Sequence, residues 1–427
     1  MSEVSNKYKD MWERLELDLP AHDQLLGVLG QFYNDIYLSQ QGRLMGMEYL
    51  DFVLSEVHGL RIQELMEAKA QGRKVVGTFC VFVPEELVLA AGAVCVGLCA
   101  GAEAGYPQAE AYLPRNTCAL IKSFFGFRLA GLCPFTNASD LIVGETTCDG
   151  KKKAYEIFGE MAPLYVMEVP QTKGRAAREL FKAEVLKFKQ KMEEISGQAI
   201  TAQALGQAIR LVNRKRRVLQ RLTKLRAAEP SPISGRDALL INQVAFYDDP
   251  ERFCGAIEKL CDEMEGRVQA GQGVTPPGAK RLLMSGCPMA VPNWKLPFVV
   301  EGAGAVIVGE ESCIGTRSTR ELVDETAIDL PAMIEALVDR YMKIDCACFT
   351  PNGERLDNIV KLARELGADG VVHYALQFCQ PYGIEAQRVR QRLQQEGIPL
   401  LRIETDYSME DVELLKNRVE AFVEMLG

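Results

Sequence analysis

The stretch Ala138-Ser-Asp-Leu-Ile-Val-Gly-Glu-Thr-Thr-Cys148-Asp-Gly-Lys-Lys contains a short apolar run that leads into a turn with a cysteine. A second stretch repeats this pattern later in the chain, as Gly367-Ala-Asp-Gly-Val-Val-His-Tyr-Ala-Leu-Gln-Phe-Cys379-Gln-Pro. Short apolar runs bounded by glycine and polar residues are typical of buried strands. We therefore predict that one structural unit occurs twice, with a cysteine after the corresponding strand in each copy.

Further strands are predicted on both sides of these two stretches, with helical patterns between them. The predicted strands begin near Val75, Ala93, Leu141 and Leu164 in the first copy, and near Arg281, Ala305, Gly370 and Pro399 in the second. Strands that alternate with helices imply parallel sheets joined by right-handed crossovers. The expected fold class is α/β, with two related, flavodoxin-like parallel-sheet domains.

A chain of 427 residues is too long for one ordinary core, so several domains are expected. We predict a helical N-terminal cap over residues 1–72 and a first α/β domain over 73–171. A charged helical connecting segment follows over 172–277, and a second α/β domain over 278–427. Gly271-Gln-Gly-Val-Thr-Pro-Pro-Gly278 is interpreted as the linker that leads into the second domain.

The charge of the chain restricts its partners. The formal net charge is -9, which argues against nucleic acid or an anionic membrane as a partner. No apolar run is long enough to span a membrane, and the polar N-terminus is unlike a secretory signal, so we expect a cytoplasmic protein. The basic run from Arg210 to Arg226 is interpreted as a solvated helix face, with a docking surface and nucleic-acid binding as alternatives.

Thirteen cysteines need an explanation, because disulfides are not expected in a reducing cytoplasm. Four of them lie in apolar or amphipathic patterns and are predicted to pack in cores: Cys95, Cys99, Cys254 and Cys261. Most of the others lie beside glycine or proline at the ends of predicted strands. Cys118 is placed in the first turn of a helix, with Asn116 or Thr117 as its cap.

The two copies match in the positions of these cysteines. Cys80 and Cys287 each follow the first strand of their copy. Cys118 precedes Cys148 by 30 residues, while Cys348 precedes Cys379 by 31. Ligands of open α/β sheets bind beyond the carboxyl ends of the strands. We therefore expect the thiols of both copies to converge on one cleft.

An all-thiol site restricts the choice of cofactor. Only three histidines are present, so any metal centre must rely on thiolates. There is no CxxC pair, which disfavours zinc and a redox dithiol; the closest pair is Cys346-Ala-Cys348. An iron–sulfur cluster accepts ligands that are scattered along the chain. Cysteines with a purely structural role remain an alternative. The sequence also contains no P-loop, Rossmann fingerprint or nucleophile elbow.

Several of these motifs together resemble the 2-hydroxyacyl-CoA dehydratase / benzoyl-CoA reductase family. The resemblance extends from about residue 75 to the C-terminus. It rests on Cys118, Thr147-Cys148-Asp-Gly-Lys-Lys, Gly286-Cys287-Pro, Asp369-Gly-Val-Val, Phe378-Cys379 and Ile398-Pro-Leu with Ile403-Glu-Thr-Asp406. It implies that Cys118, Cys148 and Cys379 hold a [4Fe–4S] cluster with one open iron.

The chain differs from the dehydratase pattern in its extra cysteines, and in this respect it is similar to the double-cubane cluster protein branch. That likeness implies an [8Fe-9S] cofactor, in which two [4Fe-4S] units share a bridging sulfide and bind six thiolates. The implied ligands are Cys118, Cys148, Cys379, Cys287, Cys313 and Cys348. Cys346 or Cys80 is the alternative for one of them.

The activity that this resemblance implies is the ATP-dependent reduction of small molecules at low potential. A separate iron–sulfur ATPase would deliver the electrons, with the basic helix near Arg216 and Arg217 as a candidate docking face, and the chain would form a homodimer. The alternative is a 2-hydroxyacyl-CoA dehydratase subunit with a single [4Fe-4S] cluster.

Four polar residues near the cysteine turns receive a structural interpretation. His373 and Tyr374 are expected to form a buried polar pair in their strand, with proton donation to a cofactor as the alternative. Glu145 and Glu310 are expected to accept hydrogen bonds from turn amides.

Overall fold

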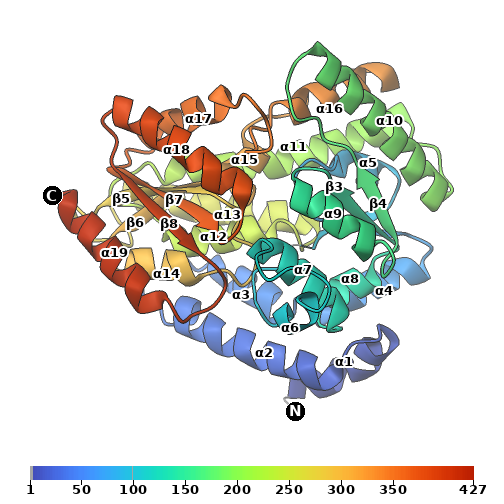
Figure 1. The fold of residues 1–427 in the computed structure, drawn as a ribbon, viewed down its shortest axis with the longest axis horizontal. Coiled ribbons are helices and arrows are strands. Elements are labelled where there is room, and N and C mark those ends of the chain that lie inside the picture. The colour runs from blue at the N-terminus through green and yellow to red at the C-terminus, as the bar shows by residue number, and fades with distance from the viewer. Residues whose placement is uncertain (1–2, 99) are drawn as a thin grey trace.

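Two parallel sheets organise the protein in a computed structural model that describes residues 3–98 and 100–427 (Figure 1). The first sheet has the order β2-β1-β3-β4, with β1 (Val75–Thr78), β2 (Val94–Gly97), β3 (Leu141–Glu145) and β4 (Leu164–Met167). The second has the order β6-β5-β7-β8, with β5 (Arg281–Gly286), β6 (Val306–Glu311), β7 (Gly370–Leu376) and β8 (Leu400–Thr405). The predicted α/β class with two related parallel sheets is confirmed, and the shared strand order is the flavodoxin-like one.

Helices surround both sheets. An N-terminal helical region precedes the first sheet and comprises α1 (Glu3–Arg14), α2 (Leu19–Tyr33), η1 (Asn34–Leu38), α3 (Met47–Ser55) and α4 (Leu60–Ala70). The first sheet carries α5 (Glu85–Ala90), α6 (Tyr106–Ala109), α7 (Ala119–Leu129), α8 (Pro134–Ala138) and α9 (Asp149–Phe158). The segment that connects the two sheets in the sequence comprises α10 (Arg175–Ser196), α11 (Ala202–Leu225), α12 (Gly235–Val244) and α13 (Pro250–Gln269). The second sheet carries α14 (Lys295–Gly302), α15 (Thr316–Thr319), α16 (Leu330–Met342), α17 (Gly353–Glu365), α18 (Gln380–Gln395) and α19 (Val412–Met425).

The central strands are apolar along most of their length because helices cover both faces of each sheet. All residues of β3 and β7 are buried. In the first sheet β1 pairs with β3, so that Val76 lies opposite Leu141; in the second, β5 pairs with β7, so that Leu282 lies opposite Gly370. Equivalent strands are therefore paired in the same register, and the cysteines that follow them lie at the carboxyl edge of each sheet.

Cysteines predicted to pack in cores do so where the structure describes them. Cys254 and Cys261 are fully buried on α13, and Cys95 packs against a cluster of buried apolar residues. The fourth of these cysteines, Cys99, lies outside the described residues.

The basic run on α11 forms the predicted solvated face only in part, because Arg210, Arg217 and Lys224 are exposed while other members are buried. Arg216 is only 4% exposed and pairs with the buried Glu86 at 2.7 Å. Lys215 pairs with Glu85 at 2.6 Å. These charges face acidic side chains on α5 because α11 packs against that helix. Burial of Arg216 also removes it from any docking surface.

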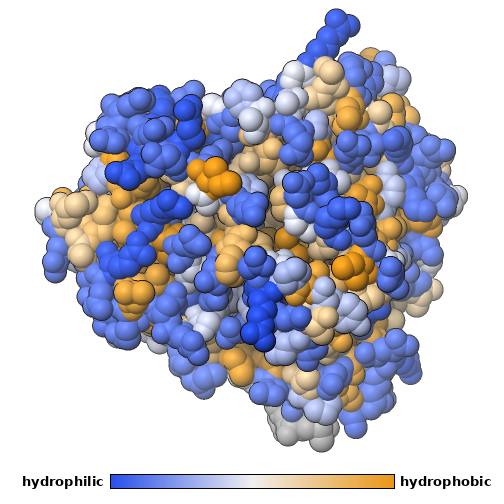
Figure 2. Space-filling view, viewed as in Figure 1, coloured by the Kyte–Doolittle hydropathy of each residue, from blue (hydrophilic) through white to orange (hydrophobic). Residues whose placement is uncertain are grey.

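The surface seen in Figure 2 is mainly hydrophilic, with separate groups of hydrophobic residues between the charged ones. Exposed large hydrophobic residues include Phe378 and Ile384, close to the end of β7. Within the described part of the chain, no helix combines the length and the apolarity that crossing a membrane requires.

Two histidines in the N-terminal region, the buried His22 and the half-buried His58, pack against each other. The Nε2 atom of His22 lies 3.0 Å from Nδ1 of His58, and the ring of Trp12 packs edge-on against His22 at 4.5 Å. Burial disfavours the charged imidazolium and lowers the pKa of His22 to about 4.

This lowered pKa predicts a loss of stability in mild acid. The unfolded chain binds a proton at His22 below about pH 6.5, whereas the folded protein does so only near pH 4. The free energy of unfolding should therefore fall by about 2 kcal/mol between pH 7 and pH 5 through this residue alone. Denaturant unfolding of the wild type and of His22→Gln at both pH values measures the effect. An equal pH dependence in the two proteins would contradict the prediction.

Candidate functional site

A cavity between the carboxyl ends of the two sheets is lined by eight cysteines. They are Cys80, Cys118, Cys148, Cys287, Cys313, Cys346, Cys348 and Cys379. All six cysteines predicted as ligands are therefore brought together, along with both of the alternatives. The expectation that the thiols of the two copies converge on one cleft is met.

The eight thiols differ in their access to solvent. Cys118, Cys148 and Cys379 are half-buried and also line a wider depression bordered by exposed residues such as Asn116 and Ile384. We call these three the outer thiols. By contrast, Cys287, Cys313, Cys346 and Cys348 are buried, and we call them the inner thiols. Cys80 is half-buried but does not border the depression.

Each outer thiol belongs to the residue that caps a helix. Cys118 is the N-cap of α7, Cys148 of α9 and Cys379 of α18. The Sγ atom of Cys148 accepts a hydrogen bond from the Lys151 amide at 3.5 Å. Helix N-termini favour negative charge, so three helix dipoles stabilise thiolates or an anionic cofactor at this position.

The prediction that Asn116 or Thr117 caps α7 is wrong, because the helix begins at Ala119 and Cys118 itself is the cap. The turn before α18 is unusual as well. Phe378 adopts φ = 64°, in the left-handed region that a bulky side chain rarely enters. This conformation turns the chain sharply between β7 and Cys379.

Neighbouring thiols influence each other's ionisation. The Cys348 thiol lies beside Cys346 and lowers the pKa of Cys346 to about 6, while the pKa of Cys348 rises. Cys80 and Cys313 form a similar pair, in which the pKa of Cys80 is raised and that of Cys313 is lowered. In each pair, one thiol therefore loses its proton more readily than the other.

Three polar residues of the cavity region were not singled out from the sequence. Lys151, Arg317 and Tyr382 each lie three or four positions after one of the cavity cysteines. This distance is about one helical turn, which brings each of the three side chains back towards the cysteine that precedes it. The same spacing was visible in the sequence and is the signal that could have identified them.

The acidic residues near the turns have different partners. Glu145 is buried and binds Lys151 Nζ at 3.2 Å, and burial raises its pKa. The described hydrogen bonds include none from a turn amide to the Glu145 carboxylate, so the bond expected there is not found. For Glu310 the same expectation is wrong, since both of its carboxylate oxygens bind the guanidinium of Arg226.

The two polar residues of β7 are buried, as expected. His373 is fully buried and its Nε2 lies 3.3 Å from the carbonyl oxygen of Tyr382. The hydroxyl of Tyr374 accepts a hydrogen bond from Asn293 at 2.9 Å. Both side chains lie within the wall of the fold, and neither belongs to the described lining of the cavity.

Comparison with known proteins agrees with this arrangement. Residues 80–426 match the family model described as 2-hydroxyglutaryl-CoA dehydratase, D-component. The chain belongs to this dehydratase family. The matched region includes all eight cavity cysteines, and the resemblance inferred from the motifs is confirmed at the level of the family.

Relatives in the family include subunits of both dehydratases and a reductase. YjiM of Escherichia coli, named as a candidate dehydratase subunit, is 40% identical over 87% of this chain and 96% of its own length. The beta subunit of (R)-2-hydroxyglutaryl-CoA dehydratase from Acidaminococcus fermentans is 24% identical over 85% of this chain and 95% of its own. One of the subunits of benzoyl-CoA reductase from Thauera aromatica is 21% identical over 83% of this chain and 91% of its own. The chain is thus an enzyme subunit of the dehydratase and reductase family.

Proposed function

We propose that this chain binds an iron–sulfur cluster in the cysteine cavity and uses it to reduce small molecules at low potential. The observation that carries the proposal is the convergence of eight thiols from one chain on one cavity. Membership of a family that includes dehydratase and reductase subunits supports the same chemistry.

The donor set of the cavity fits such a cluster. The described residues that line it include no histidine, aspartate or glutamate, so sulfur is the main metal ligand that their side chains offer. Thiolates are the ligands that iron–sulfur clusters require. Although no described group of three or more Cys, His, Asp or Glu side chains is placed to hold a single metal ion, cluster ligands surround a larger core.

Residues of this chain would prepare the site in three ways. The thiols of Cys118, Cys148 and Cys379 would hold iron at three helix N-termini, where negative charge is stabilised. Apolar side chains such as Phe79 and Val291 would keep water away from the inner thiols. The bound cluster would supply single electrons at low potential, because many thiolates around iron lower its potential.

The number of thiols favours a double cubane over a single one. A single [4Fe-4S] cluster with an open iron needs three thiolates, whereas the outer thiols and the inner thiols together offer more than six. We therefore propose an [8Fe-9S] cofactor held by Cys118, Cys148, Cys379, Cys287, Cys313 and Cys348. Cys346 remains the alternative to Cys348 because both line the cavity.

A second candidate function is a 2-hydroxyacyl-CoA dehydratase subunit with one [4Fe-4S] cluster at the outer thiols. The names of YjiM and of the Acidaminococcus fermentans subunit favour it. In that case the inner thiols would have a purely structural role, and a second, different subunit would complete the enzyme.

The proposed partners follow from the same reasoning. The chain has no nucleotide-binding motif of its own, so a separate iron–sulfur ATPase would supply the electrons. One chain contributes all eight thiols of the cavity. A homodimer is therefore the proposed assembly for the double cubane, since no other subunit is needed to complete the ligand set.

Iron content distinguishes the two candidate functions. Anaerobically purified protein should contain about eight irons per chain if the double cubane is present, and about four if a single cubane is. Cys313→Ser should reduce the iron content by about half in the first case, because it removes one thiolate of the inner half. The same variant should leave the iron content unchanged in the second case. A wild type without iron or sulfide would refute both.

A further inference from the structure

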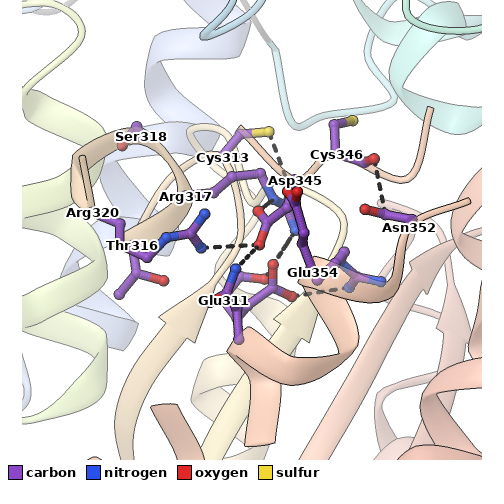
Figure 3. Close-up of polar contacts among 12 residues, drawn as sticks. Glu311, Cys313, Thr316, Arg317, Ser318, Arg320, Asp345, Cys346, Asn352 and Glu354 are labelled. Carbon is purple, nitrogen blue, oxygen red and sulfur yellow. Dashed lines mark hydrogen bonds and ion pairs between the residues drawn. The ribbon is translucent and has the colours of Figure 1, made fainter. Parts of the chain in front are cut away.

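A buried arginine touches one of the inner thiols directly. Arg317 follows β6 at the start of α15, and its side chain is fully buried. Its Nη1 atom donates a hydrogen bond to Cys313 Sγ at 3.3 Å and another to Tyr382 Oη at 2.6 Å. Figure 3 shows the guanidinium lying between the Cys313 thiol and the acidic groups beneath it. A fixed positive charge therefore lies against the sulfur.

The charge of Arg317 is held in place by a buried network of ion pairs. Its Nη2 atom binds Glu311, and its Nε lies 3.5 Å from Asp345. Glu311 is shared with the buried Arg355 at 2.9 Å. Asp345 is shared with the half-buried Arg320 at 2.9 Å (Figure 3). Because Arg317 has carboxylates on two sides, it stays charged and cannot turn away from the thiol.

The outer thiols are surrounded differently. Cys148 accepts its hydrogen bond from a backbone amide, and the nearby Lys151 ammonium is directed to Glu145 at 3.2 Å. The guanidinium of Arg317, by contrast, binds its cysteine sulfur with a side-chain donor. The outer thiols thus lie at helix N-termini, and the Lys151 charge acts on Cys148 only through space, whereas Cys313 accepts a hydrogen bond from a charged side chain in a water-poor environment, where electrostatic interactions are stronger.

We propose that Arg317 is a positioning residue that raises the reduction potential of the iron held by Cys313 above that of the iron held by the outer thiols. This inference rests on the proposed double cubane. A hydrogen bond and a positive charge at a ligand sulfur stabilise the more negative, reduced form of an iron–sulfur centre. An electron delivered to the outer half is then drawn to the inner half: the outer iron loses one electron, the inner iron gains it, and no bond is made or broken.

Two substitutions in the network should shift this potential in opposite directions. Arg317→Gln removes the charge at the thiol, so the potential of the inner half should fall. Glu311→Gln removes the carboxylate that offsets Arg317 and Arg355, so the potential should rise. We expect each variant to change the reduction equilibrium at least tenfold, which is about 59 mV for a one-electron couple. Redox titration of the anaerobic holoprotein, followed by electron paramagnetic resonance, measures the shift.

Arg320→Gln is the matched control. Arg320 shares Asp345 with Arg317 and has the same charge, but its hydrogen bonds go to Asp345 and to the Lys343 carbonyl, not to sulfur. This variant should keep the wild-type potential. A purely structural role for the network predicts that Arg317→Gln and Glu311→Gln both lower iron content or shift the potential in the same direction, and either result would overturn the proposal.

The iron content of the same samples separates this inference from the proposed function. About eight irons per chain with unchanged potentials in both variants would overturn the role of Arg317 and leave the double cubane intact. About four irons per chain in the wild type would overturn the double cubane itself. If Arg317→Gln fails to fold, the upward shift expected for Glu311→Gln still tests the proposal.

Discussion

Cys148→Ala should lose at least half of the protein's iron and all of its cluster-dependent reduction. Cys148 caps α9, lines both the cavity and the outer depression, and lies among the outer thiols on which both candidate functions depend. Alanine removes the thiolate, and no histidine or carboxylate among the described lining residues can replace it. Iron and sulfide analysis of anaerobically purified protein measures the loss.

A matched control is available on α13. Cys254→Ala makes the same change at a fully buried cysteine that packs in a core and does not belong to the described lining of the cavity. This variant should keep the iron content of the wild type. Full iron content in Cys148→Ala, or an equal loss in both variants, would show that the cavity is not the cluster site.

Arg226→Met should lower the free energy of unfolding by about 3–5 kcal/mol. Arg226 is fully buried, and its guanidinium binds both oxygens of Glu310 at 2.6 and 2.7 Å and the carbonyl of Ile307 at 2.7 Å. Methionine fills a similar volume but leaves the Glu310 carboxylate buried without this cation. Chemical unfolding of the wild type and the variant measures the difference.

Two further proteins test the reason for this loss. The double variant Arg226→Met with Glu310→Leu removes both charges and should regain most of the stability. Arg217 and Glu325 form an ion pair that is partly exposed to solvent, so Arg217→Ala should cost less than about 1 kcal/mol. If Arg226→Met costs no more than Arg217→Ala, the buried pair does not stabilise the junction of α11 with β6.

Much of the fold was predictable because each central strand can be recognised from a short stretch of sequence. Parallel strands buried on both faces, such as Leu141–Glu145 and Gly370–Leu376, are mainly apolar runs that end in glycine-rich or cysteine-containing turns. The repeat made the prediction stronger, since the same pattern occurs in both copies. All the proposed ligands lie on one cavity, which is lined by turns at the carboxyl ends of the strands and by the loops before α7 and α17.

Two of the errors concern pairs of residues that are distant in the sequence. The partner of Glu310 is Arg226, and the partner of Arg216 is Glu86; neither pairing leaves a periodic signal in the chain. Arg317 was overlooked for a related reason. Its importance comes from contacts with Cys313 and Tyr382, and only the folded chain brings Tyr382 to it.

The division of the cavity cysteines between the two sheets has a consequence for biogenesis. Cys80, Cys118 and Cys148 are synthesised with the first sheet, whereas Cys287, Cys313 and Cys379 are synthesised with the second. A cluster that bridges both sheets can therefore be inserted only after the second sheet has folded against the first. The assembly machinery for the proposed cluster must recognise a chain in which both sheets have formed, and the depression beside the outer thiols is the opening through which iron and sulfide would be delivered.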